Sequence, residues 1–77
     1  MSIQELGKIL NAMYSKAPTG EQVAHIHLFG IKYGNIITKN HLSIKDIITA
    51  SEIKSSYHTE LSKGVKLSKY VTVKDTI

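Results

Sequence analysis

The chain has 77 residues, which is enough for one domain, and it contains no cysteine, which excludes a disulfide framework and a cysteine-based zinc site. Its formal net charge is +4, and every basic residue is a lysine. Lysine attracts phosphate as a point charge but lacks the bidentate fork with which arginine reads guanine. The composition therefore predicts a single domain over residues 1–77 whose partner is anionic.

The start of the chain lacks the basic stretch and the apolar run that secretion requires, and no apolar segment is long enough to span a bilayer. We therefore expect a soluble, cytoplasmic chain with no membrane partner. The sequence shows no combination of nucleophile, base and orienting group and no glycine-rich phosphate loop. We expect no enzymatic activity and no small-molecule cofactor.

The first helix is predicted from Ser2 to about Tyr14. Ser2 and Glu5 have the spacing of a capping box, in which each side chain satisfies a free backbone group at the helix start. Apolar residues recur on one helical face, as expected of a helix that covers a core, namely Ile3, Leu6, Leu10 and Met13.

The second helix is predicted from near Gly20 to about Tyr33. Thr19 and Gln22 repeat the capping-box spacing, and apolar residues occupy more than one face, so this helix is expected to lie centrally. Gly30 and Gly34 would allow close approach of another backbone. Gly34 followed by asparagine is also typical of a helix stop.

The third helix is predicted from Ile44 to about Ala50. Before it, residues 36–38 are β-branched and are expected to be extended, and residues 39–41 are expected to form a turn. Ser43 is a favourable N-cap, with Asp46 in the first turn.

The fourth helix is predicted from Lys54 to Lys63, with Gly64 as its end. From Val65 onward apolar residues alternate with polar ones, which predicts a terminal strand paired with residues 36–38 or with the same strand of a second subunit. The predicted fold class is thus mainly α, a compact four-helix bundle containing a helix-turn-helix, with a short C-terminal β-strand.

Residues 44–64 resemble the helix-turn-helix of bacterial repressors, particularly the lac-repressor type, over roughly a quarter of the chain. The matching apolar positions are Ile44, Ile47, Ile53 and Leu61, and Ser51 is small where the two helices cross. The whole chain is also similar to an uncharacterised bacterial family of helix-turn-helix-like domains, through residues 23–33 and 66–71.

Two positions depart from the repressor pattern. Glu52 stands where the family usually has glycine, and a left-handed conformation there costs about 1 kcal/mol. His58 stands where a β-branched core residue is usual. Either the second helix of the motif is rotated so that Ile53, Tyr57 and Leu61 form its buried stripe, or the turn differs in length.

The resemblance implies that the second helix of the motif enters the major groove of double-stranded DNA, and that the domain acts as a homodimer or within a larger assembly such as a transcription regulator. Lysines recur with no acidic residue between Leu61 and Lys74, and this lysine-rich tail is expected to contact phosphates. The expected DNA-binding residues are Lys54, Ser55, Ser56, His58, Thr59, Lys63, Lys66, Lys69 and Tyr70.

Other interpretations stay open at this point. The helix pair is also compatible with a protein-interaction or dimerisation module, which a neutral or acidic face around residues 55–63 would favour. The lysines would then only form a solvated face, and Ser55 and Ser56 would only cap a helix. RNA binding would require exposed aromatic residues for stacking. Of the four histidines, His25 and His27 are two apart on a predicted helix and diverge, so we expect no metal site.

Overall fold

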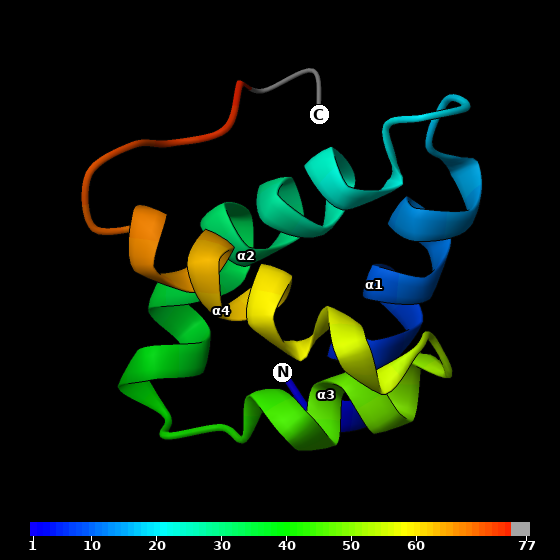
Figure 1. Cartoon of the computed structure of the whole chain (residues 1–77). Coiled ribbons are helices and arrows are strands. Elements are labelled where there is room, and N and C mark those ends of the chain that lie inside the picture. The colour runs from blue at the N-terminus through cyan, green and yellow to red at the C-terminus, as the bar shows by residue number, and fades with distance from the viewer. Residues whose placement is uncertain (75–77) are drawn as a thin grey trace.

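Four α-helices and one 3₁₀ turn make up the architecture that the computed structural model describes over residues 1–74 (Figure 1). In chain order these are α1 (Ile3–Lys16), α2 (Gln22–Lys39), α3 (Ile44–Ser51), η1 (Ser55–Tyr57) and α4 (His58–Leu67). No strand occurs within residues 1–74, so the predicted C-terminal β-strand is wrong. The prediction of a mainly helical chain is correct.

Helices α1 and α3 begin where the capping residues predict. The Ser2 side chain accepts a hydrogen bond from the Glu5 backbone at 3.0 Å, and the Glu5 carboxylate accepts one from the Ser2 backbone at 3.0 Å, so the capping box is formed. The Ser43 hydroxyl accepts from the Asp46 backbone at 3.2 Å at the start of α3.

Helix α2 differs from its prediction at both ends. It starts after Glu21 without a side-chain cap, so the expected capping box at Thr19 is not formed. It continues through Gly34 to Lys39, and residues 36–38 are helical, not extended. A turn precedes Ser43 as expected, but it covers residues 40–41, because Lys39 still belongs to α2. Leu42 donates to the Ile37 carbonyl at 2.9 Å, and His41 lies in the left-handed region at φ 53°.

The start and the end of the predicted fourth helix, and the strand after it, also need correction. Residues 55–57 form a 3₁₀ turn, α4 runs on to Leu67, and Gly64 is buried inside the helix instead of ending it. The period-two pattern that predicted a strand from Val65 onward spans the last turn of α4, the turn at residues 68–70 and residues 71–74, which have no regular secondary structure. Those residues turn back over α2 (Figure 1) and line a surface pocket together with residues of that helix, and they pair with no strand within residues 1–74.

Two close helix crossings organise the packing. The most extensive contact is between α2 and α4, and the next is between α1 and α3. A Cβ atom built on Gly30 would lie 2.7 Å from the carbonyl carbon of Gly64, and one built on Gly7 would lie 2.6 Å from the Cβ of Ala50. Glycine is therefore required at both crossings. The close approach predicted at Gly30 is confirmed, and the residue opposite it is Gly64 of α4.

A single core draws on all four helices. Its fully or almost fully buried members are Leu6, Leu10, Ile26, Phe29, Ile37, Ile47, Ile48 and Leu61. Within residues 1–74, no buried side-chain nitrogen or oxygen lacks a hydrogen-bond partner. A separate finding for the same residues is that none of the helices combines the length and apolar character needed to cross a bilayer.

Candidate nucleic-acid interface

A short turn that contains a left-handed residue joins α3 to η1 and α4. Glu52 ends α3 in the left-handed conformation, with φ 65° and ψ 11°, at the position where the repressor pattern has glycine. Three residues, 52–54, separate α3 from η1, within the usual length of such a turn. The turn length is therefore ordinary, and glutamate carries the strained conformation.

Buried Ser51 fixes the turn to the rest of the domain. Its hydroxyl donates to the Ile48 carbonyl at 2.6 Å and accepts from the Ile53 backbone at 3.3 Å. Its own carbonyl accepts a hydrogen bond from the Asn11 side chain of α1 at 2.8 Å. The end of α3 is thereby tied to α1, which orients the segment that follows.

The sequence left two arrangements open, a rotated second helix of the motif or a turn of different length. The orientation of α4 agrees with the rotated helix. Leu61 is fully buried, and Ile53 and Tyr57 are partly buried against the core, whereas His58 is exposed. The Tyr14 hydroxyl donates to that of Tyr57 at 3.3 Å, and the two ring centroids are 5.4 Å apart. The start of α4 is thus held against α1, and the helix turns its opposite side outward.

All nine predicted DNA-binding residues are exposed at the surface, namely Lys54, Ser55, Ser56, His58, Thr59, Lys63, Lys66, Lys69 and Tyr70. Thr59, Lys63 and Lys66 follow the spacing of one helical stripe, on the side of α4 away from buried Leu61 and Gly64. Lys69 and Tyr70 follow in the turn after the helix. We call the surface formed by these nine exposed residues the α4 face.

Ser55 and Ser56 do not act as helix caps within the described part of the chain. The N-cap positions of η1 and α4 are Lys54 and Tyr57, and neither of these makes a side-chain capping hydrogen bond. The hydroxyls of both serines therefore remain at the exposed start of the second helix of the motif.

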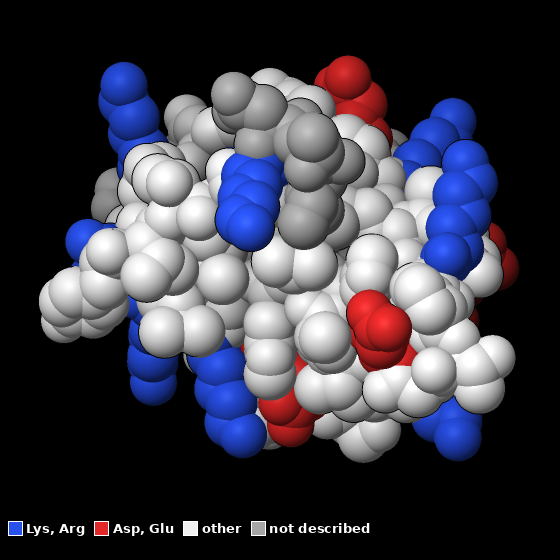
Figure 2. Space-filling model, turned by 90° about the horizontal axis from the view of Figure 1, so that it is seen from above, with Lys and Arg blue, Asp and Glu red and all other residues white. Residues whose placement is uncertain are grey.

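Positive charge is concentrated on the last third of the described residues. Residues 1–53 contain five lysines and four acidic residues, whereas residues 54–74 contain five lysines and only one acidic residue, Glu60. On the face seen from above in Figure 2, lysines project mainly around the rim and acidic side chains lie between them. That face is therefore not a continuous basic patch.

Glu60 joins α2 to α4 at the edge of the α4 face. One of its carboxylate oxygens lies 2.8 Å from Nε2 of His27, and the other lies 3.6 Å from Nζ of Lys63. The hydrogen bond from His27, with a smaller contribution from the Lys63 charge, holds the pKa of Glu60 below its usual value although partial burial opposes this. Sequence reasoning missed this group because His27 and Glu60 are 33 residues apart.

The end of α4 carries apolar exposure as well as charge. Leu67, Tyr70 and Val71 are 42%, 81% and 46% exposed. Phe29 is buried and the three other tyrosines are partly buried, so Tyr70 is the exposed aromatic residue of the described chain. A single exposed ring offers little for stacking on successive single-stranded bases.

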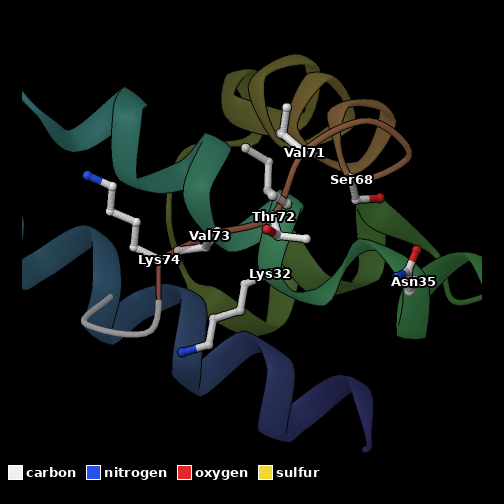
Figure 3. Close-up of a pocket in the computed structure, with 8 residues that line it drawn as sticks. Lys32, Asn35, Ser68, Val71, Thr72, Val73 and Lys74 are labelled. Atoms are coloured by element: carbon white, nitrogen blue, oxygen red, sulfur yellow. The ribbon is translucent and has the colours of Figure 1, made fainter.

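A surface pocket of about 330 Å³ lies between α2 and the last described residues (Figure 3). Lys32 and Asn35 line it from α2, Ser68 lines it from the end of α4, and residues 71–74 lie over it. The Ser68 hydroxyl donates to the Val65 carbonyl at 2.5 Å. The pocket walls are formed by lysine, amide, hydroxyl and valine groups, which provide no nucleophile with an adjacent base.

The histidines of α2 point to different partners, as their spacing predicts. Nε2 of His25 lies 4.0 Å from Glu21 one turn away, while His27 contacts Glu60 of α4. Among residues 1–74, no three side chains of the types that ligate metals gather at one place.

Comparison with known proteins gives one match. A family described as an HTH-like domain matches residues 2–74, which is nearly the whole chain. Searches of curated proteins and of solved structures found no match. The left-handed turn, the outward α4 face and this match agree with one another, and the chain belongs to the HTH-like domain family.

Proposed function

We propose that this domain binds double-stranded DNA as a transcription regulator or as the DNA-reading part of a larger assembly. The observation that carries the proposal is the α4 face, a solvent-exposed helical surface rich in lysine and hydroxyl groups that follows a helix-turn-helix turn. The family match supports a helix-turn-helix module of the DNA-binding kind.

In this proposal the start of the second motif helix enters the major groove. Ser55, Ser56 and Thr59 provide hydroxyl groups that donate to and accept from base edges, and the free backbone N–H groups of the first turn favour a nearby phosphate. Lys63, Lys66 and the residues of the following turn contact phosphates on either side. Without arginine, most of the affinity comes from phosphate attraction, and sequence discrimination is modest.

A homodimer would bind DNA more tightly than a single copy of the domain. One small helix-turn-helix rarely binds tightly alone, and two copies on half-sites one helical turn apart increase the effective concentration of the second contact. We propose that the dimer forms on DNA or within a longer chain.

The proposal is tested by fluorescence anisotropy of a labelled random-sequence duplex at two salt concentrations. A variant with Lys54, Lys63 and Lys66 replaced by glutamine is expected to bind at least about tenfold more weakly at low salt, with a shallower salt dependence. The matched control replaces Lys8, Lys16 and Lys39, which are exposed on α1 and α2 and change the net charge equally. Equal losses in both variants would show that only the net charge matters and would contradict the proposed interface.

A protein-interaction module is the second candidate, because Leu67, Tyr70 and Val71 form an exposed apolar group at the end of α4. Residues 55–63 contain one acidic residue, Glu60, and one lysine, Lys63, so this stretch is formally neutral, which favours this candidate; the lysines that favour DNA binding lie at position 54 and from position 66 onward. An absence of duplex binding by the wild type at low salt would favour it over DNA binding. Stronger binding to a single-stranded RNA than to the duplex would favour the RNA interpretation.

A further inference from the structure

Glu60 introduces a negative charge into a surface whose lysines otherwise attract anionic partners. It is the single acidic residue between residues 54 and 74, and its carboxylate bridges His27 of α2 and Lys63 of α4 at 2.8 and 3.6 Å. Lys63 is 60% exposed, so its ammonium group reaches solvent on the α4 face while Glu60 remains beside it. The same ammonium group cannot pair fully with Glu60 and with a phosphate at once.

The net charge of these three side chains depends on His27. When the imidazole is neutral, Glu60 and Lys63 cancel and the group has no net charge. When the imidazole is protonated, it compensates Glu60, and the group has a net charge of +1. Histidine is the side chain whose charge ordinarily changes between pH 8 and pH 5.

The surroundings of this group contain few other charges. On α2, the residues one turn away from His27 are uncharged, namely Val23, Ala24, Gly30 and Ile31. On η1 and α4, the residues one turn away from Glu60 are Ser56, Tyr57, Lys63 and Gly64, and the Tyr57 hydroxyl is bonded to Tyr14 of α1. His25, the nearest other histidine on α2, is directed to Glu21 instead. Glu60 and Lys63 are therefore the charged groups that face His27 from α4.

We infer that His27 regulates phosphate binding by the α4 face: its protonation releases Lys63 from Glu60, so that the domain holds nucleic acid more tightly as the pH falls. This inference rests on the proposed function. It assigns a regulatory role to three side chains that meet only in the folded chain. A purely structural role for the pair of His27 and Glu60 would stabilise the contact of α2 with α4 without changing the pH dependence of binding.

The test measures anisotropy of the labelled duplex at pH 6 and pH 8 over a range of salt concentrations. For the wild type, affinity at pH 6 is expected to be about three- to tenfold higher than at pH 8, with a salt slope steeper by up to about 0.9, the contribution of one phosphate contact. Glu60→Gln is expected to bind at pH 8 as strongly as the wild type does at pH 6. His27→Gln is expected to lose most of the pH effect.

His58 provides the necessary control, because it is exposed on the same face and its own protonation would also attract phosphate. His58→Gln is expected to retain the part of the pH effect that His27→Gln loses. Thermal melts establish that each variant is folded under the binding conditions, and Glu60→Gln tests the inference independently if His27→Gln is unstable.

The outcomes separate this inference from the proposed function. If the wild type shows no salt-sensitive duplex binding at either pH, both the proposed function and this inference are wrong. If it binds, but Glu60→Gln has wild-type affinity at pH 8 or His27→Gln keeps the full pH effect, the inference alone is overturned.

Discussion

The two helix crossings of this domain rely on glycine in different ways. At the contact of α1 with α3, a Cβ on Gly7 would meet the Cβ of Ala50 at 2.6 Å, which is a side-chain atom, and the Ala50 carbonyl carbon at 2.8 Å. At the contact of α2 with α4, a Cβ on Gly30 would meet only backbone atoms, at 2.7 Å from both Gly64 and Val65. One crossing is glycine against alanine, and the other is glycine against glycine.

This difference matters because the second crossing positions the candidate interface. A Cβ on Gly64 would lie 2.6 Å from the His27 carbonyl oxygen, so neither helix can accept a side chain there. The close approach of the two backbones also brings His27 to Glu60. The orientation of the α4 face is thus set by the most extensive helix contact in residues 1–74, whereas the crossing of α1 with α3 supports the domain from the other side.

The largest effect is expected from Gly30→Ala. Alanine in a helix is normally about 1 kcal/mol more favourable than glycine, but here backbone atoms of α4 would have to move. We expect a net loss of about 3 kcal/mol in the free energy of unfolding, measured by urea denaturation. A variant as stable as the wild type would show that the two backbones are not in close contact.

Gly7→Ala is expected to cost less, about 2 kcal/mol, because part of the obstruction is a removable side chain. Adding Ala50→Gly should relieve that part. The double variant is expected to be at least about 1 kcal/mol more stable than the sum of the two single changes predicts. Denaturation of all four proteins closes the cycle. Simple additivity would contradict the contact between Gly7 and Ala50.

Glycines at helix contacts also explain where the prediction of the fold from the sequence was wrong. Capping residues have local signatures, so the starts of α1 and α3 were predictable from Ser2, Glu5 and Ser43. Gly34 and Gly64 looked like helix stops because a glycine in a crossing and a glycine at a helix end have the same local sequence. Only the opposing helix, more than 30 residues away, distinguishes them.

The candidate site shows a similar division. The surface character of the α4 face followed from helical spacing, and all nine predicted residues are exposed. The bridge from His27 through Glu60 to Lys63 could not be predicted, because it depends on how α2 and α4 cross. The alternation after Val65 was misinterpreted because apolar residues that pack against a helix can repeat like those of a strand.

A smaller effect, a gain in the free energy of unfolding instead of a loss, is expected at the turn after α3. Glu52 adopts a left-handed conformation, which costs a non-glycine residue about 1 kcal/mol or more. Glu52→Gly is expected to raise the free energy of unfolding by up to about 1 kcal/mol, as measured by denaturation. His41→Gly, at the other left-handed position, is the matched comparison. A loss of stability in Glu52→Gly would mean that its side chain makes a contact that outweighs the strain.

The smallest effect is expected in the stability of the fold at acid pH. It compares Glu5, whose hydrogen-bond partner lies at the start of the same helix, with Glu60, whose partner lies on another helix. Hydrogen bonds from Ser2 lower the pKa of Glu5, and the hydrogen bond from His27 lowers the pKa of Glu60. A lowered pKa means that the stabilisation is present above the ordinary value of 4.5 and is lost as the pH falls through the folded value. Melting temperatures measured from pH 7 to pH 3 should therefore fall less steeply in Glu60→Gln than in the wild type.

Ser2→Ala should likewise reduce, but not abolish, the part of that slope that Glu5 contributes, because it removes the side-chain contribution of Ser2 to the lowered pKa of Glu5 and keeps the larger contribution of the Ser2 backbone N–H. The two changes should be additive in the slope, since Glu5 acts within α1 and Glu60 acts across α2 and α4. If Glu60→Gln leaves the acid slope unchanged while Ser2→Ala reduces it, the contact of His27 with Glu60 is not maintained in solution. The α4 face would then be oriented by the glycine crossing alone.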